Sequence, residues 1–266
     1  MMTIQNYVRA GSLEEAYALN QDRRNRILGG MLWLKMTSLT VPTAIDLCQL
    51  GLDAIEEGPE EFSIGAMATL RQLEQHPGLN QYTQGAVRKA VENIVGVQFR
   101  NMATVGGSIF GRFGFSDVLT VFLALDTDVE LYKGGLVPLE VFAQMERDRD
   151  ILVRLIVKKR PGRCVYLAMR NSRTDFPILT CAVSRVEGEY RASIGARPAP
   201  AMVLRDEPGI LERGISESSA RAFGDFAAER VPTGGNLRGS APYRSQLVRV
   251  LPRRALLELG GLNCGD

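Results

Sequence analysis

The spacing of apolar residues along the chain predicts short strands and helices that alternate in both halves of the sequence. Alternating or β-branched runs predict strands, and apolar residues that recur every three or four positions predict helices. One predicted strand opens the segment Arg26–Met36, and another begins at Phe62. The remaining predicted strands are Val129–Tyr132, Ile151–Val157 and Ile178–Val186. The predicted helices lie after Ser12, in Gln84–Val97, from Val118, in Val137–Phe142 and in Gln246–Leu259. This periodicity alone supports a mixed α and β protein.

The apolar pattern breaks at Lys158–Gly162, where three basic residues, a proline and a glycine follow one another. Such a cluster is typical of a connection between folded units. A chain of 266 residues is long enough for two domains. We therefore predict one domain over residues 1–159 and a second over residues 160–266.

Composition and charge exclude several classes of protein. Apolar residues make up 45% of the chain and charged residues 23%, as in soluble globular proteins. The 32 basic and 30 acidic residues are mixed along the chain and leave a net charge of +2, which predicts neither a nucleic-acid partner nor a membrane partner. Met1–Ala10 contains Gln, Asn and Arg and no apolar run, so we expect no secretory signal and a cytoplasmic location.

The cysteines and the single histidine do not form a recognisable metal site. Cys48, Cys164, Cys181 and Cys264 are far apart, whereas zinc and iron–sulfur sites use closely spaced pairs. We expect no metal site and reduced, buried thiols. His76 precedes a proline at a helix end, which favours a capping role over catalysis.

The segment with the strongest chemical signal is Thr104-Val105-Gly106-Gly107-Ser108. Glycine lacks the Cβ that would keep a ligand away from the backbone, so successive N–H groups can converge on one phosphate. Hydroxyl groups at Thr104 and Ser108 offer additional donors. A Gly-Gly pair between Ser and Thr is also common in ordinary turns, and the pair alone does not separate these alternatives.

The residues around this pair resemble a known family. The chain reads Arg100-Asn101-Met102-Ala103-Thr104-Val105-Gly106-Gly107-Ser108-Ile109, then Phe115-Ser116-Asp117 and a Leu-rich run to Asp126. This resembles the FAD-binding medium subunits of molybdenum hydroxylases, the xanthine dehydrogenase and carbon monoxide dehydrogenase medium-subunit family. Ser108 stands where relatives usually have Asn. Ile64-Gly65-Ala66 and the closing Ser240-Ala241-Pro242-Tyr243-Arg244 are also similar, so the resemblance covers nearly the whole chain.

The resemblance implies an α+β fold, namely a two-lobed FAD-binding type 2 (PCMH-like) domain followed by a smaller α+β C-terminal domain. It also implies the cofactor-binding residues. The first cofactor loop corresponds to Ile27, Leu28, Gly29, Gly30, Met31, Leu32 and Trp33, and the remaining candidates are Ile94, Gly96, Thr104, Gly106, Gly107, Ser108, Asp117 and Leu152. In the family the side chains at Ile94 and Leu152 contact opposite faces of the flavin, although on periodicity alone both would be core residues.

Two positions depart from the family pattern. Met31 and Leu32 replace the polar residues of the first loop, and no lysine follows Tyr166, where relatives carry one near Leu167 or Ala168. Arg170 offers a replacement charge, but we expect it to be a solvated surface residue.

Asp117 has two possible roles. The family uses an aspartate at this spacing to hydrogen-bond FAD, whereas the alternative is a carboxylate that caps the helix from Val118.

The implied function is an electron relay. The family passes electrons from a molybdopterin-binding large subunit, through a two-iron two-sulfur small subunit, to FAD on this subunit and then to NAD. We expect no catalytic acid or base in this chain. The alternatives are a scaffold subunit that has lost FAD, which the two departures motivate, and a freestanding flavin reductase.

Overall fold

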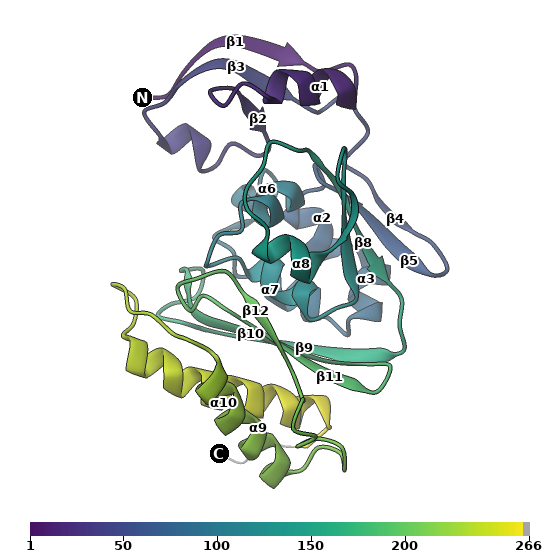
Figure 1. Cartoon of the computed structure of the whole chain (residues 1–266), viewed down its shortest axis with the longest axis vertical. Coiled ribbons are helices and arrows are strands. Elements are labelled where there is room, and N and C mark those ends of the chain that lie inside the picture. The colour runs from purple at the N-terminus through teal and green to yellow at the C-terminus, as the bar shows by residue number, and fades with distance from the viewer. Residues whose placement is uncertain (263–266) are drawn as a thin grey trace.

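The computed structural model describes residues 1–262 and contains three β-sheets that follow one another along the chain. Figure 1 shows them stacked from the N-terminus at the top to the C-terminal helices at the bottom. The first two sheets and their helices form two lobes, and the third sheet lies beneath the second lobe.

The first lobe is a three-stranded parallel sheet in the order β1 (Thr3–Arg9), β3 (Thr40–Asp46) and β2 (Arg26–Leu28). Parallel strands need long connections, and α1 (Leu13–Asn20) provides the first of them. The helix predicted after Ser12 is confirmed, and Ser12 caps it by accepting the N–H of Glu15 on its hydroxyl. The Glu15 carboxylate accepts the N–H of Gly11. A short 3-10 turn, η1 (Leu34–Met36), follows β2 and the glycine pair.

The second lobe contains a five-stranded antiparallel sheet and seven short helices. The strands occur in the order β4 (Ile55–Glu57), β5 (Glu61–Gly65), β8 (Leu152–Lys158), β6 (Thr127–Leu131) and β7 (Gly135–Pro138). The helices are α2 (Leu70–Gln75), α3 (Pro77–Tyr82), α4 (Ala86–Val91), α5 (Val97–Arg100), α6 (Val105–Phe110), α7 (Asp117–Leu123) and α8 (Leu139–Gln144). Every residue of α7 is buried, which explains the uninterrupted apolar run in this segment.

The C-terminal part is an antiparallel sheet in the order β12 (Met202–Arg205), β11 (Glu189–Gly195), β10 (Pro177–Val186) and β9 (Gly162–Arg170). The helices α9 (Glu217–Arg230) and α10 (Ala241–Leu259) cover one face of the sheet, and α4 and α7 of the second lobe lie against the other. Because both faces of β10 are covered, its first eight residues are buried, in agreement with the apolar run that predicted this strand. The predicted domain boundary lies in the connection between β8 and β9.

The single helix predicted for Gln84–Val97 is wrong. Residues 84–100 instead form α4, a turn and α5. Gln84 and Val95 both have left-handed backbone angles, with φ of 51° and 49°, which a continuous right-handed helix does not allow. Arg100 donates a hydrogen bond to the Ile94 carbonyl in this turn, and Gly96 becomes the N-cap of α5. The helical periodicity in this segment therefore comes from two separate elements whose apolar residues pack against the same core cluster.

The predicted α+β organisation is otherwise confirmed, with two lobes ahead of a separate α+β unit. No helix within residues 1–262 is both long enough and apolar enough to cross a membrane.

Candidate functional site

A cavity of about 760 Å³ lies between the first and second lobes and extends to the start of the C-terminal part. Its volume is in the range of small-molecule and cofactor sites. The candidate residues that line it are Ile27, Leu28, Gly29, Gly30, Met31, Leu32, Trp33, Ile94, Thr104, Gly106, Gly107, Ser108, Asp117 and Leu152. Gly96 is the one candidate that does not line the cavity. It is the N-cap of α5.

The cavity wall contains two glycine segments, residues 29–32 (the first) and residues 104–108 (the second), and they contact each other. A Cβ added to Gly30 would overlap the backbone carbonyl of Met102, and one added to Gly29 would lie 2.8 Å from Thr104 Oγ1. A Cβ on Gly106 would lie 2.7 Å from the Ala66 carbonyl oxygen. Gly29 and Gly30 therefore allow the first lobe to approach the second closely, and Gly106 allows α6 to approach the end of β5 within the second lobe. Gly107 is different, since a Cβ there meets only Thr104 Oγ1 at 3.1 Å and would otherwise project into open space.

The N–H groups of the second glycine segment are already used, which corrects the expectation that they converge on a phosphate. Gly106 donates to the Ala66 carbonyl at 2.7 Å, Gly107 donates to Thr104 Oγ1 at 3.2 Å, and Ser108 donates to the Thr104 carbonyl. The Ser108 hydroxyl also donates to that carbonyl.

The first glycine segment keeps its donors. Within residues 1–262, no protein acceptor takes the N–H groups of residues 29–32. Met31 has φ of 58°, which turns the backbone sharply after the glycine pair. Unpaired N–H groups that border a cavity are suited to bind an anion.

A buried ion pair joins α2 to the last residue of α5. The Arg100 guanidinium donates from Nε to Glu74 Oε2 at 2.7 Å, and its Nη1 donates to the Ile94 carbonyl at 3.1 Å. Arg100 is 5% exposed. Removing Glu74 would leave the Arg100 charge buried without its counter-charge, whereas Glu74 also pairs with Arg71 at 2.9 Å. The pair therefore fixes the turn that presents Ile94 to the cavity.

Aromatic rings form one end of the cavity. The Trp33 ring lies 6.3 Å from the Phe99 ring, 5.8 Å from Phe115 and 5.6 Å from Phe176, measured between centroids. Phe113 stacks on Phe115 at 5.2 Å. Trp33 was a candidate, but the sequence did not single out the phenylalanines, because they come from three separate segments. Together these rings make an apolar wall, in which neighbouring rings meet mostly edge to face.

Asp117 is buried and bound to two side chains of β9. Tyr166 donates its hydroxyl to Asp117 Oδ1, and Arg170 Nη2 lies 2.6 Å from the same oxygen. Arg170 is thus held in a buried ion pair, with 10% of its side chain exposed, and the expectation of a solvated arginine is wrong. Burial raises the pKa of Asp117 to about 6, although Arg170 and Tyr166 act to lower it.

The helix-cap alternative for Asp117 is also wrong. The N-cap of α7 is Ser116, whose hydroxyl accepts the N–H of Leu119 at 3.1 Å. Asp117 occupies the first helical position, and its carboxylate turns toward β9 and the cavity.

The remaining polar candidates agree in part with expectation. His76 caps α3 by accepting the N–H of Leu79 on Nδ1, as predicted. Cys164 and Cys181 are buried free thiols, but Cys48 is exposed, and Cys264 lies outside the described residues. Among residues 1–262, no group of three or more His, Cys, Asp or Glu side chains is arranged to hold a metal ion.

Comparisons with known proteins agree with this geometry. The family model of the FAD binding domain in molybdopterin dehydrogenase matches residues 2–159. The chain is 26% identical to the uncharacterized protein YgfM of Escherichia coli K12, over 93% of each chain. It is 25% identical to the nicotine 6-hydroxylase medium subunit of Paenarthrobacter nicotinovorans, over 96% of each. The fold matches a chain in the structure of carbon monoxide dehydrogenase from Hydrogenophaga pseudoflava with a TM-score of 0.82, 23% identity and 96% of each chain covered.

The family model covers more than half of the chain, including both glycine segments, Asp117 and Leu152. The chain therefore belongs to the family of FAD-binding medium subunits of molybdenum hydroxylases.

Proposed function

We propose that this chain binds FAD in the cavity between its lobes and relays electrons from iron–sulfur clusters on a partner subunit, through FAD, to NAD. The observation that carries the proposal is the cavity itself, which brings 14 of the 15 candidate residues together. They come from five separate parts of the chain, and packing of the core alone does not require them to share an open space.

The first glycine segment fits the anionic part of the cofactor. Its unpaired N–H groups supply donors where the family's polar side chains are replaced by Met31 and Leu32. Gly107 fits as well, because its missing Cβ leaves open space at the cavity wall. We propose that Thr104 and Ser108 line the same anion site and that Gly106 keeps α6 close to Ala66 within the second lobe.

The apolar part of the cavity fits the flavin ring. Ile94, between α4 and α5, and Leu152, at the start of β8, both line the cavity, and we propose that they contact the flavin by dispersion. We also propose that Asp117 hydrogen-bonds FAD. Both of its side-chain bonds within the protein go to Oδ1, which leaves Oδ2 for a cofactor donor.

FAD supplies the chemistry of this relay when bound, because a flavin accepts electrons singly and delivers them in pairs. The protein's own residues bind and orient the cofactor and exclude water from one side. We assign no residue of this chain a role as a general acid or base on the hydroxylated substrate.

The partners are proposed from the relatives. The nicotine-oxidising relative is named a medium subunit, and the carbon monoxide dehydrogenase is described with a Mo-pyranopterin cofactor. We propose a molybdopterin-binding large subunit and a two-iron two-sulfur small subunit as partners, in a cytoplasmic complex of the xanthine dehydrogenase type. We also propose that residues 1–159 and 160–266 are its two domains. Co-purification of three subunits, when the chain is produced with its neighbouring genes, tests the assembly.

Absorbance of the purified chain in the flavin bands, before and after addition of FAD, tests the cofactor. A yellow protein is expected, and a protein that stays colourless after FAD is added and removed by gel filtration would favour the scaffold alternative. Anaerobic addition of NADH then tests the acceptor. Bleaching of the flavin bands is expected, and flavin that dithionite reduces but NADH does not would exclude NAD as the partner.

A further inference from the structure

The cavity lining includes three arginines that form no ion pair within residues 1–262, namely Arg26, Arg147 and Arg149. Arg147 is exposed and donates to the Gly111 carbonyl. Arg26 starts β2 in the first lobe, and Arg149 lies in the loop between α8 and β8 in the second. Both are partly buried.

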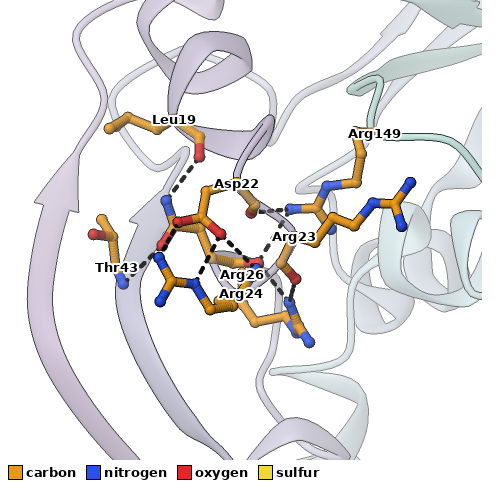
Figure 2. Close-up of polar contacts among 8 residues, drawn as sticks. Leu19, Asp22, Arg23, Arg24, Arg26, Thr43 and Arg149 are labelled. Atoms are coloured by element: carbon orange, nitrogen blue, oxygen red, sulfur yellow. Dashed lines mark hydrogen bonds and ion pairs between the residues drawn. The ribbon is translucent and has the colours of Figure 1, made fainter.

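Arg149 joins the two lobes through neutral acceptors. Its Nε donates to the Asn20 carbonyl at 2.6 Å, and its Nη2 donates to Asn20 Oδ1 at 2.7 Å and to the carbonyls of Asp22 and Asn25 at 3.0 and 3.1 Å. In Figure 2 the Arg149 side chain reaches across to the loop that carries Asp22 and Arg26. Nη1 is not engaged in these bonds.

Arg26 is likewise held by backbone carbonyls. Its Nη1 donates to the carbonyls of Arg23 and Asn25, so Nε and Nη2 are left without a bond to the protein within residues 1–262. Figure 2 shows Arg26 directly after the loop that carries Arg23 and Arg24.

Asp148 and Asp150 also line this end of the cavity, but within residues 1–262 neither pairs with Arg26 or Arg149, and the Asp150 carboxylate accepts backbone N–H groups instead. Burial and the charges of Arg26 and Arg23 lower the pKa of Arg149, and Asp22 only partly opposes this. Asp22 itself is paired with Arg24 at 2.9 Å. By contrast, the cavity's other buried arginine, Arg170, is paired with Asp117. An anionic ligand would relieve the repulsion between the cations near Arg149.

Within FAD, only the diphosphate carries negative charge, and it belongs to the half that ends in adenosine. β2 runs from Arg26 to the glycine pair in three residues, which is about 10 Å at roughly 3.3 Å per residue. A diphosphate at the N–H groups of residues 29–32 is then within reach of the long side chain of Arg26. The uncharged flavin ring fits the aromatic wall around Trp33.

We infer that Arg26 and Arg149 bind the adenosine-diphosphate half of FAD and supply the attraction that the first glycine loop lost with Met31 and Leu32. This inference rests on the proposed binding of FAD. It adds the residues that let the protein distinguish FAD from an uncharged flavin. Guanidinium groups suit this role because they bind phosphate oxygens with several donors at once.

The test compares three ligands on flavin-free full-length protein. Dissociation constants for FAD, ADP and riboflavin are measured by calorimetry for the wild type, Arg26→Met, Arg149→Met and the control Arg24→Met. Arg24 lies on the same loop, but its side chain is 75% exposed, is paired with Asp22 and does not line the cavity.

Arg26→Met and Arg149→Met should each raise the dissociation constants of FAD and ADP by about tenfold or more, which is the loss expected for one charge-assisted bond. The dissociation constant of riboflavin should stay within about twofold of the wild-type value. Arg24→Met should change none of the three. The wild-type constant for FAD should also rise more steeply with salt than that of either variant, because salt screens the attraction.

Equal losses for FAD and riboflavin would mean that the arginines only shape the cavity, and unchanged FAD and ADP affinities would mean that they take no part. Either result overturns the inference while FAD binding by the wild type stands. If the wild type binds no FAD, the proposed function fails instead, and the ADP measurements decide the role of the arginines independently. The Arg149→Met variant loses the hydrogen bonds between the two lobes. If it does not fold for that reason, the Arg26→Met variant alone still tests the inference.

Discussion

Arg170 of β9 pairs with Asp117 at the start of α7 at a distance of 2.6 Å, and this buried ion pair joins the C-terminal sheet to the second lobe at the cavity wall. Tyr166 donates to the same carboxylate oxygen. The arginine thus places a positive charge beside the cavity in the strand where relatives carry a lysine. Its position depends on Asp117, because this ion pair is buried and only 4% of Asp117 is exposed.

Asp117→Asn should destabilise the protein at neutral pH. It leaves the Arg170 guanidinium buried without its counter-charge, and breaking such a pair costs about 3 to 5 kcal/mol. This replaces the expectation for a helix cap, in which asparagine would serve equally well. Urea unfolding of the flavin-free protein measures the loss, and the double variant Asp117→Asn with Arg170→Met should recover part of it. Additive losses in the double variant would contradict the pairing.

Asp117 should also make stability depend on pH. Its pKa is raised from 3.8 to about 6 by burial, so between these values the folded state holds a proton that the unfolded state has released. Unfolding free energy therefore falls as pH rises from 4 to 6, by up to about 3 kcal/mol from this group at about 1.4 kcal/mol per pH unit. The comparison is between wild type and Asp117→Asn across this range. A difference that stays constant from pH 4 to 7 would show that Asp117 does not titrate there.

The sequence predicted the elements whose pattern is local and missed those that depend on distant partners. β10 and α7 were predicted because long apolar runs reflect burial on all sides. The break between α4 and α5 was missed because a left-handed Val95 and the Arg100 bond to Ile94 leave no trace in periodicity.

The candidate site divides in the same way. The glycine segments were found because close backbone approach requires glycine, and the structure uses Gly30 and Gly106 for this purpose. Arg149 and Phe176 were missed because each gains its significance only where the fold places it, on the loop after α8 and just before β10. Charge and aromaticity alone do not separate such residues from ordinary surface and core positions.

Gly107→Val should reduce FAD occupancy and leave the fold intact. The added side chain meets only Thr104 Oγ1 among protein atoms and extends into the space proposed for the cofactor. Flavin content per protein measures the effect, and circular dichroism checks folding. Gly11→Ala is the control, because a Cβ at Gly11 meets only Glu15 at 3.5 Å and Gly11 does not line the cavity. Full flavin content in a folded Gly107→Val protein would remove Gly107 from the site.

Trp33 should report directly on the ligand. It is the single tryptophan of the chain and lines the cavity against Phe115 and Phe176, so all tryptophan emission comes from this wall. FAD bound beside it should quench that emission by energy transfer to the flavin, with a midpoint that matches the dissociation constant from calorimetry. Binding of ADP should leave most of the Trp33 emission of the ligand-free protein in place, because ADP has no flavin ring to accept the energy. Trp33→Phe should abolish the signal while keeping FAD affinity within about threefold, since an aromatic ring remains at the wall. If FAD binds and Trp33 emission stays unchanged, the flavin lies elsewhere on the protein and the aromatic wall has another purpose.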